Sequence, residues 1–278
     1  DFYCSYCAIP YARGHSRSRN PQKVLDQIVR LAEAGYKEFV LGGINLGLYG
    51  KEKEDNYFLP DLLRDIESID LVKKIRISSI EPQLIDEKML EYFSHTKKLC
   101  HHLHIPLQSA SDRILKLMNR RYTTSDFKDK LREISSVLKD AAFGLDVIVG
   151  FPGETDQDFE EAVSFLKELN FSYLHVFSYS KRPGTAAAKM KNHVNGKVIR
   201  ERNAILTKLS HQKTMEYTQH LVSESAHLEG IAEEKIEGFW TALSDHYIRI
   251  YSNSEHLVKG DMLVGKSSQI FSDGISVK

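Results

Sequence analysis

The chain has 278 residues with 38 basic and 38 acidic side chains, so its formal net charge of zero argues neither for nor against a nucleic-acid partner. Its length allows one large domain plus a small one, and its three cysteines are too few for a disulfide framework. No apolar run reaches the roughly 18 residues that a membrane-spanning helix needs, so we expect a cytoplasmic protein in a reducing compartment.

From residue 20 to residue 220, helical patterns alternate with short apolar runs. Asn20 followed by Pro21 is typical of a helix start, and Gly35 is a plausible end. Further helices are predicted at 59–68, 86–93, 112–119, 125–139, 155–169 and 199–220, and strands at 38–42, 74–78, 102–107, 144–150 and 173–179. This alternation predicts a parallel sheet with helices outside, as a barrel or an open doubly wound sheet.

After about residue 220 the pattern changes to short apolar–polar alternation separated by turn residues. Strands are predicted at 241–243, 247–251, 262–264, 269–271 and 275–277, as a separate antiparallel β-unit. We therefore divide the chain into residues 1–221 and 222–278. The second part has nine acidic and five basic residues, so its charge does not favour RNA. Its aromatic side chains predict either base stacking or a small core: Phe239, Trp240, Tyr247 and Tyr251.

Cys4 and Cys7 form a C-x-x-C step near the start of the chain. This step alone is compatible with zinc, a redox disulfide or an iron–sulfur cluster. No second C-x-x-C or histidine pair follows at zinc-finger spacing, and no predicted strand precedes the step as in thioredoxin-like proteins. Cys100 stands before two histidines at a strand start, and we interpret it as a core residue rather than a metal ligand.

Each predicted strand of the first domain ends in a polar or glycine-rich loop. These loops are 42–45, 78–82, 108–111, 150–154 and 180–185. The carboxyl ends of parallel barrel strands lie on one rim, so together the loops predict one site, although each alone is compatible with ordinary loop chemistry.

Five stretches together resemble the radical S-adenosylmethionine (SAM) methylthiotransferases over essentially the whole chain. They are C-S-Y-C-A-I-P-Y-A-R-G (4–14), H-I-P-L-Q-S-A-S (104–111), M-N-R-R-Y-T (118–123), D-V-I-V-G-F-P-G-E-T (146–155) and Y-S-K-R-P-G-T-A-A-A-K-M (179–190). The resemblance implies an α/β fold, with a partial TIM-like (β/α)6 parallel barrel as the radical SAM core and a small all-β, RNA-binding TRAM-like domain after it.

The resemblance also implies the cofactors. Cys4 and Cys7 match two of the three cysteines of C-x-x-x-C-x-x-C, which hold a 4Fe–4S cluster whose open iron binds SAM; the first would stand one place before Asp1. A second 4Fe–4S cluster is expected on an N-terminal domain that this sequence does not contain. We therefore expect this chain by itself to cleave SAM slowly once the first cysteine is restored, but to transfer no methylthio group.

The remaining site residues also follow from the resemblance, which assigns no catalytic residue. Expected contacts to SAM are Ser79, Glu81, Gln108 and Ser109, while glycines that permit close backbone approach are Gly42, Gly43 and Gly150. Arg13 is expected to face the SAM carboxylate or a tRNA phosphate. Ala110 stands where the family usually has glycine, so we expect it to adopt a conformation that glycine favours.

Several basic residues fall on predicted extended or loop segments. They are Arg13, His15, Arg17 and Arg19, and the pairs Arg120-Arg121 and Lys181-Arg182. They predict either a patch for RNA phosphates or a solvated surface.

Within the family, the loops at 43–47, 76–82 and 179–185 look most like the branch that methylthiolates C2 of N6-threonylcarbamoyladenosine beside the anticodon. The alternatives are methylthiolation of isopentenyladenosine in tRNA and an RNA-binding module without catalysis. The expected partners are tRNA and an electron donor, with no membrane and no DNA.

Overall fold

The computed structural model describes residues 2–278, and its first unit is a curved parallel sheet. The strands are β1 (Glu38–Leu41), β2 (Lys74–Ile77), β3 (His102–His104), β4 (Ala142–Val149) and β5 (Tyr173–Ser178). The β1–β2, β3–β4 and β4–β5 ladders are all parallel, and a parallel bridge from Ile75 to Leu99 links the two groups. The strand order follows the chain without reversal, which favours the part-barrel over a doubly wound sheet. The described residues thus contribute five parallel strands, where the resemblance implies six.

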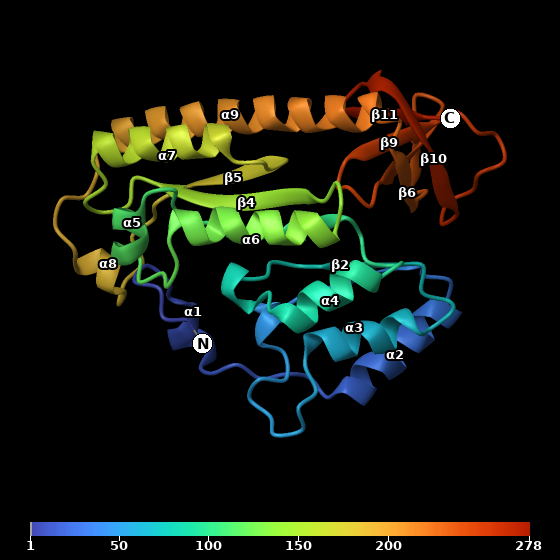
Figure 1. Cartoon of the computed structure of the whole chain (residues 1–278), viewed down its shortest axis with the longest axis horizontal. Coiled ribbons are helices and arrows are strands. Elements are labelled where there is room, and N and C mark those ends of the chain that lie inside the picture. Colours follow the sequence, from blue (N-terminus) through green and yellow to red (C-terminus); the bar gives the residue numbers. More distant parts are fainter. Residues whose placement is uncertain (1) are drawn as a thin grey trace.

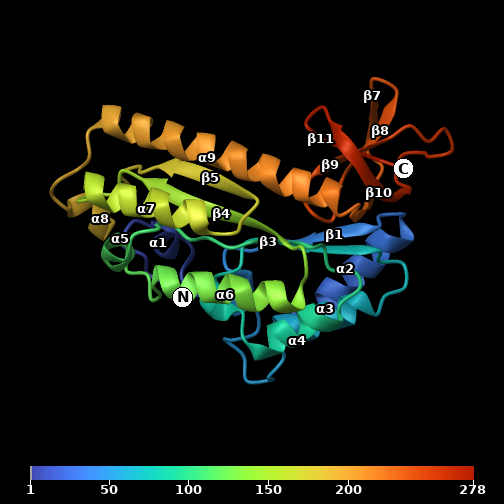
Figure 2. The same ribbon diagram turned by 45° about the horizontal axis from the view of Figure 1, so that its top comes forward.

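The helices lie outside these strands, as Figures 1 and 2 show. They are α2 (Pro21–Glu33), α3 (Leu59–Glu67), α4 (Glu87–His95), α5 (Asp112–Leu117), α6 (Thr124–Val137), α7 (Asp156–Glu168) and α9 (Gly196–Ser223). The predicted start at Asn20 is confirmed, because its side chain accepts a hydrogen bond from the Lys23 backbone N–H. Two short helices were not predicted, α1 (Ile9–Arg13) and α8 (Ala186–Lys189), nor were the 3₁₀ turns Leu46–Leu48 and Pro82–Leu84. No helix in the described part of the chain is long and apolar enough to cross a membrane.

The second unit is a curled six-stranded sheet at the C-terminal end of α9 (Figure 2). Its strands are β6 (His227–Ile231), β7 (Glu234–Ile236), β8 (Phe239–Leu243), β9 (Arg249–Ser252), β10 (Met262–Phe271) and β11 (Gly274–Val277), in the order β6-β10-β11-β9-β8-β7. The described residues 224–278 contain no helix. The division after residue 221 stays a prediction, since α9 continues to Ser223 and Leu221 packs in the core of the second unit.

The expectation that this unit is purely antiparallel is wrong at one pair, because β11 pairs with β9 in parallel. After β10, a tight turn with Ser272 at φ 52° sends β11 into the place between β10 and β9, in the direction of β9. The two strands predicted at 262–264 and 269–271 are a single strand, β10, with a register shift between Ser267 and Gln269.

The two units meet through buried charges on β2. Lys74, with a side chain 4% exposed, forms an ion pair with Glu229 and lies 3.9 Å from the Asp245 carboxylate. Arg76 donates a 3.1 Å hydrogen bond to the Ser244 carbonyl and lies over the ring of Tyr247. The turn at residues 244–247 of the second unit is therefore held against β2 of the first unit, because the buried side chains of Lys74 and Arg76 need their partners in the second unit.

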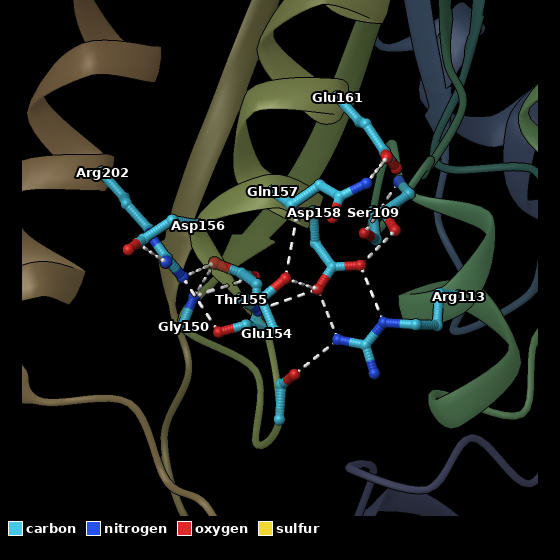
Figure 3. A network of polar contacts seen from close by, with 12 residues as sticks. Ser109, Arg113, Gly150, Glu154, Thr155, Asp156, Gln157, Asp158, Glu161 and Arg202 are labelled. Carbon is cyan, nitrogen blue, oxygen red and sulfur yellow. Dashed lines mark hydrogen bonds and ion pairs between the residues drawn. The ribbon is translucent and has the colours of Figure 1, made fainter.

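The loop after β4 is fixed by a second polar network, shown in Figure 3. Asp158 of α7 accepts hydrogen bonds from the side chains of Ser111, Arg113 and Thr155. Burial by itself would raise the pKa of Asp158, but these hydrogen bonds outweigh it and hold the pKa well below its usual range. On the other side of the loop, Arg202 of α9 binds the carboxylate of Glu154.

We predict that Lys74→Met lowers the free energy of unfolding of the second unit by about 3 kcal/mol, because it leaves the Glu229 carboxylate without its ion-pair partner and removes a buried cation 3.9 Å from Asp245. Trp240, the single tryptophan of the chain, lies in that unit, so its fluorescence in a urea titration reports the transition. Lys197→Met is the matched control, since Lys197 pairs with Glu201 on the exposed face of α9 and should change stability by less than about 0.5 kcal/mol. Equal effects of the two substitutions would contradict the role assigned to Lys74.

We predict that Asp158→Asn destabilises the first unit by about 2 kcal/mol at pH 7, because it removes charge-assisted hydrogen bonds. The pKa of Asp158 is lowered in the folded protein, so its stabilisation is present above the unfolded pKa of about 4 and is lost as the pH falls toward the folded value. The difference from the wild type should therefore shrink in urea titrations below about pH 4. Asp129→Asn, in an exposed pair with Arg132, should show little difference at any pH.

Candidate active site

The loop that carries Cys4 and Cys7 is anchored on both sides. The Ser5 backbone N–H donates to the Met118 carbonyl at 2.9 Å, and the Ala187 N–H donates to the Ser5 carbonyl at 2.8 Å. Between the cysteines, Tyr6 packs edge-on against buried Phe151, with ring centroids 6.4 Å apart. The end of α5, the start of α8 and the loop after β4 therefore fix where the two thiols lie.

Both cysteines line one large cavity at the carboxyl ends of the strands, with a volume of about 1020 Å³. Of the predicted site residues, the cavity is lined by Cys4, Cys7, Arg13, Gly42, Gly43, Ser79, Glu81 and Gln108. Ser109 and Gly150 are not among its lining residues. The strand ends after β1, β2 and β3 thus come together beside the cysteines, as parallel strands require.

Arg120 is the central cation of this site and is one of the residues that line the cavity. Its side chain is only 3% exposed, forms two hydrogen bonds with the Glu81 carboxylate and donates to the Cys4 Sγ at 3.4 Å. It also donates to the Pro106 carbonyl and to the Tyr122 hydroxyl. Burial alone would lower the pKa of Arg120, but Tyr122 and Glu81 outweigh it and raise the pKa.

The interpretation of Arg120 as part of an exposed phosphate patch is therefore wrong, whereas its neighbour Arg121 is exposed. The M-N-R-R stretch signalled this position, but sequence alone could not distinguish the buried arginine from the exposed one. The Glu81 carboxylate forms an ion pair with Arg120, so in this structure Glu81 is the counter-ion of that guanidinium.

A chain of hydrogen bonds leads from the cavity along the inner face of the sheet. Ser79 Oγ and His104 Nδ1 lie 2.6 Å apart, and His104 Nε2 lies 2.9 Å from Asp146 Oδ1. His175 Nδ1 lies 3.4 Å from the same carboxylate oxygen. The ligand atoms of His104, Asp146 and His175 lie within 4.8 Å of one another, a spacing that could hold a metal, but hydrogen bonds already satisfy both nitrogens of His104. Sequence reasoning missed these three residues, although strand alternation places them on one face.

The predicted glycines divide into two kinds. A Cβ added at Gly42 would meet no atom within 4 Å, and one at Gly43 would make only ordinary contacts, so both leave open space in the cavity wall. Gly150 has φ +76°, and a Cβ there would meet Ile199 of α9 at 2.4 Å. Its N–H donates to the carboxylate of Glu154, so Gly150 serves the packing of its loop.

The expectation of a glycine-like conformation at Ala110 is wrong. Ala110 is buried and is not among the positive-φ residues of the described chain, whereas Gln108, two positions earlier, has φ 67°. The Gln108 backbone is held there by the Asp146 carbonyl and the Ile148 N–H. A non-glycine residue in this region carries strain, which is typical of binding sites. Ser109, by contrast, is buried, and its hydroxyl oxygen accepts a hydrogen bond from the Ser111 backbone N–H.

The other basic and aromatic candidates lie in different places. Arg13 ends α1 rather than lying on an extended strand, and with His15, Arg17 and Arg19 it lines the cavity rim. Lys181 and Arg182 are exposed. Of the aromatic residues, Tyr251 is buried and serves packing, whereas Tyr247 is exposed and stacks on His102, with ring centroids 4.2 Å apart.

The residues present fit an iron–sulfur cluster and SAM. Cys4 and Cys7 are free thiols of intermediate exposure on the cavity wall, and thiolates are the ligands that such clusters take. The buried Asn45 Oδ1, which lacks a hydrogen-bond partner, belongs to a residue of the same wall and suits a donor of a polar ligand. Cys100 is fully buried and does not line the cavity, and burial raises the pKa of its thiol to about 12, as suits a core residue.

The sequence pattern of the Radical SAM superfamily matches residues 1–166, which is more than half of the chain. The chain is 41% identical over 261 residues to the threonylcarbamoyladenosine tRNA methylthiotransferase MtaB of Bacillus subtilis (strain 168), covering 92% of this chain and 58% of that protein. It is 38% identical over 263 residues to the tRNA-2-methylthio-N(6)-dimethylallyladenosine synthase of Syntrophus aciditrophicus (strain SB), covering 94% and 57%. The chain thus spans less than three fifths of the curated relatives it matches.

Solved structures agree on the fold. Streptococcus suis SuiB bound to S-adenosylmethionine superposes with a TM-score of 0.51 at 19% identity, covering 77% of this chain and 45% of that one. The methyltransferase TsrM from Kitasatospora setae gives 0.55 at 17% identity, covering 67% and 36%. Through its matched residues, its part-barrel and its cysteine-lined cavity, this chain belongs to the radical SAM superfamily.

Proposed function

We propose that the chain is the SAM-cleaving core of a tRNA methylthiotransferase, which adds a methylthio group to C2 of N6-threonylcarbamoyladenosine next to the anticodon. The observation that carries the proposal is the cavity in which Cys4 and Cys7 face the strand-end residues Ser79 and Gln108. The relative named for threonylcarbamoyladenosine supports the substrate, since its similarity extends over nearly the whole chain. The second candidate is dimethylallyladenosine, supported by relatives of similar identity.

The residues of the chain have separate tasks in this proposal. Cys4 and Cys7 would hold a 4Fe–4S cluster, which together with SAM supplies a carbon-centred radical by one-electron reduction of the sulfonium. Arg120 fixes the Cys4 thiol relative to Glu81, so the metal-binding loop and the loop after β2 keep one geometry. Gly42 and Gly43 leave room for a ligand at the cavity wall.

The RNA-binding part of the proposal rests on the second unit, residues 222–278, together with the rim of the cavity. Arg13, Arg17 and Arg19 line that rim and are cations suited to phosphate contacts. A tRNA substrate implies a cytoplasmic location, and reduction of the cluster requires an electron donor.

We predict that Cys7→Ala abolishes both 5′-deoxyadenosine formation and the 2-methylthio nucleoside, whereas Cys100→Ala keeps both near the wild-type level, because Cys7 lines the cavity and Cys100 does not. The measurement is nucleoside analysis by mass spectrometry of tRNA from cells that lack the gene, complemented with each variant as its gene encodes it. Bound iron and sulfide are measured on the purified proteins. An RNA-binding module without catalysis would contain no cluster iron, and methylthio product from Cys7→Ala would refute the assignment.

We predict that Gly42→Ala leaves the free energy of unfolding unchanged, because the added methyl group contacts no protein atom within 4 Å. The same methyl group would project into the cavity, so we expect it to weaken SAM binding at least about tenfold. Gly150→Ala should do the reverse: it should destabilise the fold by about 2 kcal/mol or more, because of its positive φ and the contact with Ile199. Urea titration and equilibrium binding of SAM to the reconstituted protein measure the two effects. Unchanged SAM affinity in Gly42→Ala would contradict close approach at this wall.

A further inference from the structure

The inner face of the sheet is polar, although the interior of a closed barrel is usually filled by branched apolar side chains. His102, His104 and Asp146 contact one another or their neighbours on β5 across this face. The residues that alternate with them along the strands, Leu103 and Leu145, point the other way into the hydrophobic core. The inner face of the part-barrel is therefore polar, and we call the space that it encloses the polar chamber; His102 is buried within it.

Strand β5 presents the most exposed part of this chamber. His175 has a side chain 48% exposed, and Phe177, two residues on, is 51% exposed, while the alternating Leu174 is buried. The rings of His175 and Phe177 lie edge to face, with centroids 6.4 Å apart. Strand packing does not require an exposed histidine and phenylalanine on this face, whereas a nucleobase uses such a pair for hydrogen bonding and stacking.

His175 is oriented by the carboxylate that links the chamber to the cavity. Its Nδ1 lies 3.4 Å from Asp146 Oδ1, and Asp146 lines the same cavity as Cys4 and Cys7. His104 lies 2.9 Å from the same oxygen and is itself held by Ser79, so the position of Asp146 is determined from two sides. Nε2 of His175 is then the ring nitrogen that Asp146 does not engage.

We propose that His175 is a specificity-determining residue, whose Nε2 forms a hydrogen bond with a polar substituent on N6 of the target adenosine. This inference rests on the proposed function and deepens it by choosing between the two candidate substrates. A neutral imidazole with its proton on Nδ1 accepts from an O–H or N–H group at Nε2, and a protonated one donates to a carbonyl or carboxylate. The threonylcarbamoyl group offers all of these partners, whereas the dimethylallyl group is a hydrocarbon and leaves Nε2 unpaired in either state.

The size of the effect follows from the cost of an unpaired polar group once the bound nucleoside covers His175, which is 48% exposed in the free chain. A site built to form a hydrogen bond rejects a ligand that lacks the partner more strongly than an apolar pocket rejects an added group. For one hydrogen bond that involves a charged group, a preference of about tenfold or more is expected. Phe177 stacks on either base equally and does not contribute to the choice.

The test uses two anticodon stem-loop RNAs that differ only in the N6 substituent, threonylcarbamoyl or dimethylallyl. Their dissociation constants are measured by fluorescence anisotropy with the protein as its gene encodes it, reconstituted with iron, sulfide and SAM. We expect the wild type to bind the threonylcarbamoyl RNA at least about tenfold more tightly. His175→Phe keeps a ring without its nitrogens and should reduce the preference to within about threefold, while His175→Gln keeps an amide near Nε2 and should retain most of it.

The matched control is His95→Phe, because His95 lies at the end of outer helix α4 and its ring forms hydrogen bonds with residues of its own helix. Formation of 5′-deoxyadenosine by each variant shows that its fold and SAM site are intact. If the wild type prefers the threonylcarbamoyl RNA and His175→Phe keeps that preference, the role of His175 is refuted while the proposed function stands. A wild-type preference for the dimethylallyl RNA also refutes it. If the wild type binds neither RNA better than an unrelated hairpin, the proposed function fails and the inference fails with it.

Discussion

The site depends on one buried cation. The guanidinium of Arg120, at the wall of the cavity, joins the cysteine loop, the loop after β2 and the carbonyl of Pro106 after β3. Because Arg120 is excluded from water, each of its N–H groups requires a partner, and three separate loops provide those partners. Loss of any one partner would leave a buried charge or donor unsatisfied, so the loops are held together as one structure.

The loops at the strand ends divide into those that meet the cavity and those that hold the site in place. Gly42, Ser79 and Gln108 lie on the cavity wall, whereas Gly150 and Glu154 bind each other and the start of α9. The networks around Asp158 and Arg202 fix the loop after β4, against which Tyr6 of the cysteine loop packs. The ion pairs of these networks, shown in Figure 3, involve no residue that lines the cavity, yet they hold the loop against which the cysteine loop packs.

The second unit closes the opposite end of the chamber and is joined to it by charge. Lys74 and Arg76 belong to β2 but find partners in residues 229–247, and Tyr247 stacks on His102 at the start of β3. His102 lies in turn 2.8 Å from the Tyr173 hydroxyl on β5, where Gly144 leaves room for the tyrosine ring. The polar chamber is therefore bounded by the cavity at one end and by the second unit at the other.

The sequence by itself determined the long helices and parallel strands of the first unit, the cysteine pair and most of the loops that line the cavity, because strand alternation, capping residues and motif spacing are local signals. It could not determine which arginine of Arg120-Arg121 is buried, that Gln108 rather than Ala110 has a positive φ, or that Gly150 packs against Ile199. Nor did it reveal that Ser79, His104, Asp146 and His175 meet. These features depend on contacts between residues far apart in the chain, and burial and charge pairing across strands are decided only when the barrel closes around them.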